Sequence, residues 1–177
     1  MKTKLDFKWL IKIVLISITA TMVFTLASTE VLGRTGYIIS FSVLVVFIVL
    51  GVVFDIIGVA VTAAVEAPFH SMAAHKQRGA TEALRLVKNA DKVSSFCNDV
   101  VGDVTGIVSG TTAGLIAARL MESMATENLI ITLLISGAVT GLTVVGKAVG
   151  KNSAINNSTA VVLRVGKLIN FLHLKKN

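Results

Sequence analysis

Four long apolar runs constrain this chain more than any other feature. They cover residues 9–26, 37–65, 93–120 and 129–149 of the 177-residue sequence. A bilayer core of about 30 Å takes about 20 helical residues to cross, and lipid offers no partner to an unpaired backbone amide. A membrane β-barrel would instead alternate apolar and polar residues. The sequence therefore predicts an all-α membrane protein with about four transmembrane helices.

The positive charges fall between these runs and predict the orientation. Three segments hold all the lysines and arginines except Arg34 and Arg119; they are Lys2, Lys4, Lys8 and Lys12, then Lys76, Arg78, Arg85, Lys88 and Lys92, then Lys147, Lys151, Arg164, Lys167, Lys175 and Lys176. Four crossings place the three segments on one face, which the positive-inside rule makes cytoplasmic. We expect a plasma-membrane protein with both termini in the cytoplasm, whose net charge of +7 faces anionic lipid and not nucleic acid.

The same pattern divides the chain into three parts. Residues 1–35 hold the first run and a turn, and we interpret them as a retained signal anchor because the apolar run exceeds the usual length of a signal peptide. Residues 36–153 hold a three-helix transmembrane core with a cytoplasmic loop at residues 67–92. Residues 154–177 form a basic juxtamembrane helix.

Two cytoplasmic segments predict amphipathic helices. In the loop, TEALRLVK offers good helix formers after Thr81, which we expect to cap the helix. Near the C-terminus, apolar residues recur at helical spacing at Val161, Val165, Leu168, Ile169 and Leu172. This second helix either lies on the inner leaflet or packs on the protein's own cytoplasmic loops.

Glycines line one face of the third run. Gly102, Gly106, Gly110 and Gly114 are each four residues apart, and the fourth run echoes them with Gly137 and Gly141, then Gly146 and Gly150. Small residues at this spacing let two helix backbones approach closely in a membrane. The pattern predicts tight helix packing, with a partner helix from the same chain or from a second copy.

Polar residues inside the runs are the candidate site. Asn98, Asp99 and Asp103 lie in the third run, where a helix would place the two acids one turn apart, and Asp55 lies in the second. Carboxylates are costly in a bilayer, and their oxygens suit Mg²⁺, Ca²⁺ or Na⁺. We therefore predict a metal site formed by these four residues, with Mg²⁺ as a candidate ion and Lys147 facing Asp55.

A structural interpretation of these acids stays open beside the metal site. Asp99 and Asp103 lie close to the cytoplasmic end of their run, where they can pair with Lys92 or Lys147. Asp55 can be neutral and bonded to a serine.

Enzyme motifs are missing from the sequence. No nucleotide-binding loop, nucleophile elbow or zinc signature occurs, the histidines have no ligand-like spacing, and Cys97 is the single cysteine. We expect a protein that is not an enzyme and needs no organic cofactor.

Two stretches carry a family resemblance. Residues 73–95 read AAHKQRGATEALRLVKNADKVSS, and the stretch from Val144 reads VVGKAVGKNSAINNSTAVVLRVGKLI. The first stretch is similar to the loop of a known protein family, which contains Gly-Ala, an "ALRLL" helix and Asp-Arg/Lys. The second is similar to the segment of the same family that enters a juxtamembrane helix. Over residues 59–174 the chain thus resembles the transmembrane domain of the CNNM/CorC (also CorB) magnesium-transporter family. The resemblance implies a homodimer whose helices enclose a cation site.

The chain also departs from that family. Where the family has Ser-x-Ser-Glu, this chain has FDIIG at residues 54–58. Where the family has Gly-Asn-Asn, the chain has NDVVGD at residues 98–103, and where the family has Gly-Glu-x-x-Pro-Lys, the chain has GKAVGK at residues 146–151. The sequence ends before the family's CBS pair, so we expect no adenine-nucleotide site. Two functions follow as expectations: a divergent module for divalent-cation transport or permeation, or a non-transporting scaffold or regulatory subunit that packs against another helix bundle.

Overall fold

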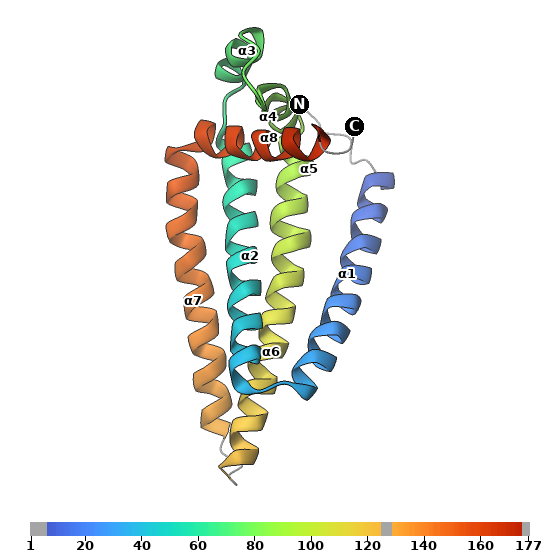
Figure 1. Ribbon diagram of the computed structural model, residues 1–177, viewed down its shortest axis with the longest axis vertical. Helices are drawn as coiled ribbons and strands as arrows, with labels where there is room; N and C mark the ends of the chain where they lie inside the picture. The colour runs from blue at the N-terminus through green and yellow to red at the C-terminus, as the bar shows by residue number, and fades with distance from the viewer. Residues whose placement is uncertain (1–6, 125–128, 175–177) are drawn as a thin grey trace. The chain divides into compact units, whose positions relative to one another are not determined.

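The computed structural model describes residues 7–124 and 129–174, without the side chains of residues 31–34 and 173–174. Lys2, Lys4, Lys175 and Lys176, which the orientation argument counts, lie outside the described residues. The elements are α1 (Phe7–Arg34), α2 (Tyr37–Ala63), α3 (Glu66–Ala74), α4 (Ala80–Lys88), α5 (Ala90–Ser95), the π-helix η1 (Phe96–Val101), α6 (Gly102–Ser123), α7 (Leu129–Asn156) and α8 (Ser158–Leu174) (Figure 1).

Four stretches of helix are long and apolar enough to cross a membrane. They are Phe7–Glu30, Tyr37–Ala63, Ala90–Ser123, which combines α5, η1 and α6, and Leu129–Asn156. Each contains the greater part of one of the four apolar runs, so the predicted all-α membrane fold is confirmed. The chain is an integral membrane protein.

The chain forms two compact units, and each of these four stretches except the first contributes to both. The first unit holds residues 1–51 and 100–145, and the second holds residues 52–99 and 146–177. The first therefore combines α1 with the early part of α2, α6 and most of α7. The second combines the later part of α2 with α3, α4, α5, the last turns of α7, and α8.

In the first unit, α1 packs along α6 and meets α2 through an aromatic pair. The rings of Phe24 and Phe47 meet edge to face with centroids 5.9 Å apart. At the turn between α1 and α2, Arg119 Nη1 donates to the carbonyl oxygen of Thr35 at 2.7 Å, and Tyr37 Oη donates to that of Arg119 at 3.1 Å. The turn and α6 are thus held together by two polar contacts.

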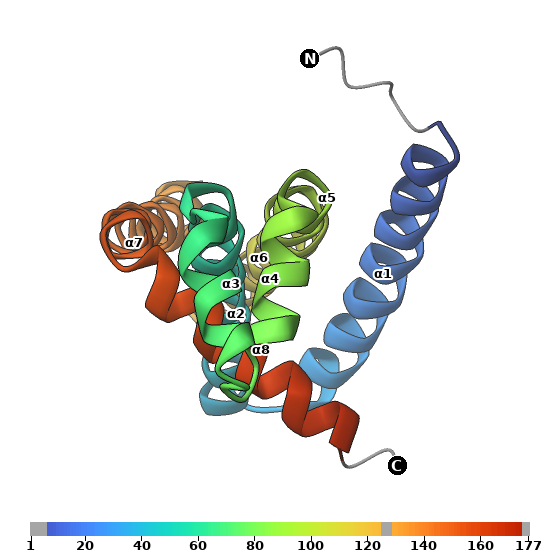
Figure 2. The same cartoon turned by 90° about the horizontal axis from the view of Figure 1, so that it is seen from above.

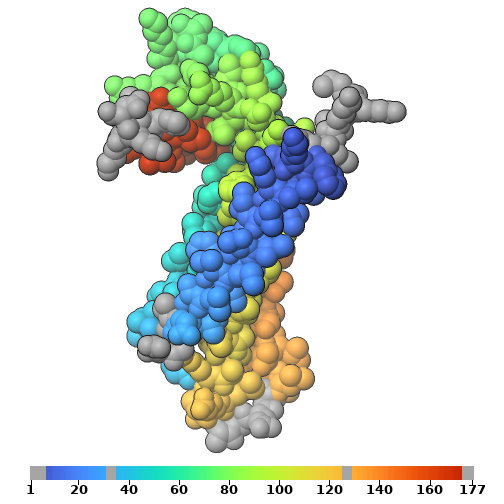
Figure 3. Space-filling model, turned by 90° about the vertical axis from the view of Figure 1, so that its right-hand side faces the viewer, coloured from blue at the N-terminus to red at the C-terminus, as the bar shows by residue number. Residues whose placement is uncertain are grey.

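The outer side of α1 faces the viewer in Figure 3. Its large apolar side chains are exposed, among them Leu15 and Met22, which are 58% and 62% accessible. An exposed apolar surface along a whole helix is what a lipid-facing span requires.

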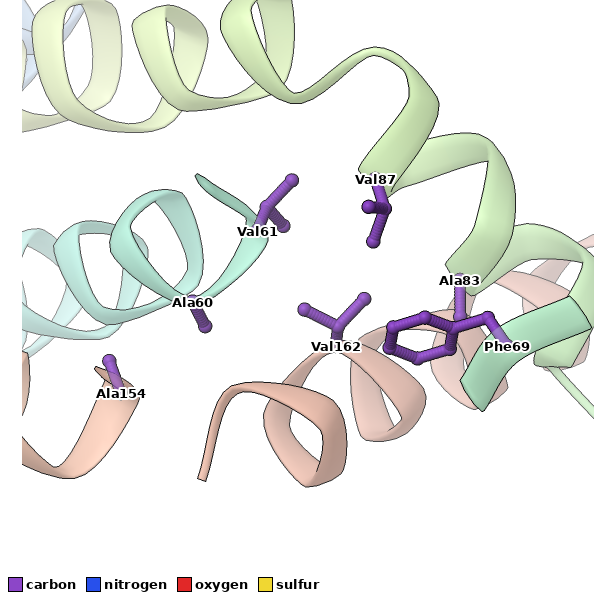
Figure 4. Packing of buried hydrophobic residues seen from close by; sticks show 7 residues of the cluster. All are labelled: Ala60, Val61, Phe69, Ala83, Val87, Ala154 and Val162. Carbon is purple, nitrogen blue, oxygen red and sulfur yellow. The ribbon is translucent and has the colours of Figure 1, made fainter. Parts of the chain in front are cut away.

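The second unit has a buried core to which five helices contribute (Figure 4). Its members are Ala60 and Val61 from α2, Phe69 from α3, Ala83 and Val87 from α4, Ala154 from α7 and Val162 from α8. Phe69 is completely buried and is the largest of them. The core therefore fixes the short helices α3 and α4 to the ends of the long helices.

A close backbone approach in this unit joins α8 to the start of α4. A Cβ atom at Gly166 would lie 2.3 Å from the carbonyl oxygen of Gly79, and one at Gly79 would lie 2.5 Å from the amide nitrogen of Lys167. Gly79 also has φ of 79°, a left-handed conformation that costs a side chain energy. Both glycines are therefore required where α8 passes beneath α3 and α4 (Figures 1 and 2).

The structure corrects three sequence expectations. Gly79, not Thr81, is the N-cap of α4, and no side chain caps this helix. The predicted boundary at residue 154 falls inside α7, which continues to Asn156. A further helix, α3, covers most of the first part of the loop 67–92. Pro68 does not prevent this helix, because it falls in the first turn, where proline is tolerated.

Of the two alternatives for α8, packing on the protein's own loop segment describes one face, and contact of the other face with the inner leaflet stays a prediction. Val162 and Gly166 are buried against the 67–92 segment. Leu168 and Phe171, however, are each 64% accessible, and Leu172 is 65% accessible. One face of α8 thus packs on the protein, and the other remains an exposed apolar surface.

Candidate cation site

Asp55 is the buried acid of the second unit. It lies on α2 with 5% of its surface accessible, and its Oδ2 atom lies 3.8 Å from Lys151 Nζ on α7. That distance makes an ion pair but no hydrogen bond, and Oδ2 has no hydrogen-bond partner among the described residues. Lys151 is half exposed. The carboxylate therefore has a counter-ion but an unsatisfied oxygen.

The register between α2 and α7 explains why Lys151 is the partner. A Cβ atom at Gly150 would lie 2.6 Å from Ile56 Cγ1, and one at Gly146 would lie 3.0 Å from Val52 Cγ2. The two glycines thus seat two branched side chains of α2 in a groove on α7, which brings the following Lys151 opposite Asp55. The prediction that Lys147 faces Asp55 is therefore wrong, because the actual partner lies one helical turn further along α7.

Asn98 supplies a second unpartnered oxygen in the same unit. Its Nδ2 atom donates to Ser94 Oγ at 3.1 Å, while its Oδ1 atom is buried and has no hydrogen-bond partner in the described part of the chain. The amide lies directly against α2, because a Cβ atom at Gly58 would be only 2.3 Å from Asn98 Oδ1. Gly58 therefore makes the space that the amide occupies.

The two oxygens are close to the same stretch of α2. Asp55 and Gly58 are three residues apart, so their Cβ positions are neighbours on the helix surface. Buried polar atoms nearly always have a partner, so each of these two unsatisfied oxygens beside α2 calls for a donor or a cation. Carboxylate and amide oxygens are hard ligands, which suit Mg²⁺, Ca²⁺ or Na⁺.

A π-helix presents Asn98. The segment Phe96–Val101 forms i→i+5 hydrogen bonds, a rare geometry that occurs frequently at functional sites. Asn98 and Asp99 lie within it, whereas Asp103 lies on α6. The uniform α-helical spacing that we expected for Asp99 and Asp103 is therefore wrong.

The other two predicted ligands are placed differently. Asp99 and Asp103 both have exposed side chains, and they belong to different units. Within the described ranges, no group of three or more His, Cys, Asp and Glu residues is placed to hold a metal ion. Of the predicted four, Asp55 therefore lies on α2 and Asn98 lies against Gly58, three residues further along that helix, and the structure adds Lys151 and Gly58, which the sequence did not indicate.

The glycines divide into two sets. Gly146 and Gly150 contact α2, as described above. A Cβ atom added at Gly106, Gly110 or Gly114 on α6 would meet no atom of residues 7–124 and 129–174 within 4 Å, and the same holds for Gly137 and Gly141 on α7. The predicted close packing is thus present within the chain at one end of α7, while the α6 face is left open.

Comparison of the chain with protein-family models, with curated proteins and with solved structures returned no match.

Proposed function

We propose that this protein is a small, divergent module for divalent-cation transport or permeation, and that Asp55 and Asn98 bind the ion. The pair of buried oxygens without donors carries this proposal. Mg²⁺ keeps several waters and needs only one or two carboxylates, so one aspartate, one amide and water form a suitable ligand set. The resemblance to the CNNM/CorC family supports the choice of Mg²⁺, in a plasma membrane with both termini cytoplasmic.

Lys151 gives this site an internal competitor. Its ammonium group is bound loosely to Asp55 and lies on a half-exposed, flexible side chain. A cation that binds Asp55 Oδ2 has to displace it. Loss of this one ion pair is a small barrier, because a partly exposed pair contributes only about 0–1 kcal/mol.

The function is tested by flux into liposomes that contain the purified protein, with Mg²⁺, Co²⁺ and Na⁺ supplied in turn. Asp55→Asn is expected to lower Mg²⁺ flux by about 10- to 100-fold or more, since even an outer-shell group of a metal site is worth that much. Asn98→Ala is expected to act in the same direction.

Asp91→Asn is the matched control, because Asp91 is an exposed acid in the first turn of α5. Its flux is expected to equal that of the original protein. Undiminished flux in a folded Asp55→Asn protein would reject the site, and absence of flux for every ion in the original protein would reject transport.

A second proposal concerns the partner of α6. Asp103, Gly106, Gly110 and Gly114 share one side of this helix by their spacing of three or four residues, and the three glycines face open space. An aspartate turned to lipid costs about 2.5–3.5 kcal/mol, so this side is better covered by protein. We propose that a second copy covers it, and a different helix bundle is the scaffold alternative.

Gly110→Leu is expected to convert the homodimer into a monomer, because a leucine keeps two backbones from meeting. Ala138→Leu adds similar bulk at an exposed position of α7 and serves as the control. Crosslinking and mass measurement in detergent distinguish the outcomes. A dimer that survives Gly110→Leu rejects this interface, and a heterologous protein that is lost with the variant supports the scaffold.

A further inference from the structure

The junction of α8 with the α3–α4 loop contains a second, independent feature. A cavity of about 380 Å³ is lined by Gln77, Arg78, Lys167, Asn170 and Phe171. Two cations, two amides and one aromatic ring thus surround one space, at a place that the proposed cation site does not use.

The fold forces the two cations together. Arg78 directly precedes Gly79, and Lys167 directly follows Gly166, so the backbone contact between these glycines brings the two basic residues to the same place. Like charges in proximity are unfavourable unless an anion lies between them. In the part of the chain that the structure describes, neither Arg78 nor Lys167 has a carboxylate within ion-pair distance.

The remaining polar groups agree with an anion that accepts hydrogen bonds. The Asn170 amide is oriented by Glu82, whose Oε1 accepts from Asn170 Nδ2 at 3.0 Å. Glu82 is thus already engaged on one side of Asn170. Arg and Lys with neighbouring amides form the donor set that binds phosphate oxygens.

The surroundings indicate where this phosphate comes from. Phe171 belongs both to the cavity lining and to the exposed apolar face of α8, next to Leu168 and Leu172. On a membrane-bound protein, such an apolar face inserts at the boundary between headgroups and acyl chains. The phosphate that lies beside an acyl chain is that of a phospholipid.

We propose that this cavity binds the phosphate headgroup of an anionic phospholipid. Arg78 and Lys167 bind the phosphate oxygens, Gln77 and Asn170 border the headgroup, and the acyl chains run along Phe171, Leu168 and Leu172. Binding of one lipid at a defined place is distinct from the diffuse attraction of a basic protein to an anionic surface.

The test uses the full chain in phosphatidylcholine nanodiscs that contain a minor fraction of phosphatidylglycerol, with retained lipid measured by native mass spectrometry. Arg78→Gln combined with Lys167→Gln is expected to weaken phosphatidylglycerol retention by about tenfold or more. Arg85→Gln combined with Lys88→Gln removes two exposed cations from α4 outside the cavity and is expected to lower retention by about threefold at most.

Equal losses in the two double variants, or no loss in the first, would overturn the proposal. Inorganic phosphate at millimolar concentration is a separate arm, in which we expect no displacement of the lipid; displacement would assign the cavity to a soluble phosphate. If the double variant does not fold, Lys167→Gln alone repeats the test, because Lys167 is exposed and its backbone is unaffected.

Discussion

Gly166→Ala is expected to detach α8 from α4, because no space exists for a methyl group at this position. The added carbon would lie 2.3 Å from the carbonyl oxygen of Gly79 and 2.9 Å from the amide nitrogen of Ala83. Both are backbone atoms, so relief requires movement of α4 as a whole. Overpacking usually costs about 1–3 kcal/mol of unfolding free energy, and this contact belongs at the upper end.

Gly79→Ala is expected to cost at least as much. Its Cβ atom meets the backbone of Lys167, and the left-handed φ of 79° adds about 1–2 kcal/mol for a residue with a side chain. Thermal unfolding in detergent measures the loss, and faster hydrogen exchange in α4 and α8 locates it.

Gly137→Ala is the matched control for both variants, because its Cβ atom meets nothing within 4 Å and alanine favours helix. Its thermal stability is expected to be unchanged or slightly higher. If Gly166→Ala unfolds at the temperature of Gly137→Ala, the close approach of α8 to α4 is not present in the protein.

Lys151→Met is expected to lower the stability of the protein without added cation and to strengthen its binding of Mg²⁺. Without added cation, Asp55 loses its counter-ion and stays buried, so the protein is destabilised; removal of one partner of a fully buried pair costs about 3–5 kcal/mol, and half-exposed Lys151 implies less. With Mg²⁺ present, no ammonium competes for the carboxylate. The variant should then bind Mg²⁺ up to about fivefold more tightly, which corresponds to the loss of a competing ion pair worth up to about 1 kcal/mol.

A double-mutant cycle separates this effect from simple loss of packing. Asp55→Asn combined with Lys151→Met removes both charges, so we expect most of the stability to return and the stabilisation by Mg²⁺ to disappear. Lys147→Met is the control, because Lys147 lies one turn away without an ion pair to a described residue. Weaker Mg²⁺ binding in Lys151→Met would show that the lysine assists the ion and does not compete with it.

The membrane spans could be predicted from the sequence because they depend on length and hydropathy alone. An apolar run such as residues 37–65 has one stable outcome in lipid, a helix whose backbone is internally paired. This property is local, so neighbouring structure does not change it. The glycine spacing predicted close helix contacts, but only Gly146 and Gly150 make them, because such contacts depend on which helix lies opposite.

The details of the site depended on tertiary packing and were not predictable. Lys147 and Lys151 are equally suitable partners for Asp55 by spacing, and the seating of Ile56 against Gly150 decides between them. The π-helix that presents Asn98 has no sequence signature that we can identify. Gly79 became the N-cap of α4 in place of Thr81 because its left-handed backbone allows the contact with α8.

If Asp55 binds a cation as proposed, its ion pair with Lys151 makes the response to membrane voltage depend on the bound ion. The pair has no net charge, so without its ion the site is insensitive to the transmembrane field. A bound Mg²⁺ adds two charges, each worth about 2.3 kcal/mol for every 100 mV that it crosses. In the proposed function, an electrical gradient would therefore act on the loaded site and leave the unloaded one at rest, so the membrane potential would itself supply both the direction and the energy of transport.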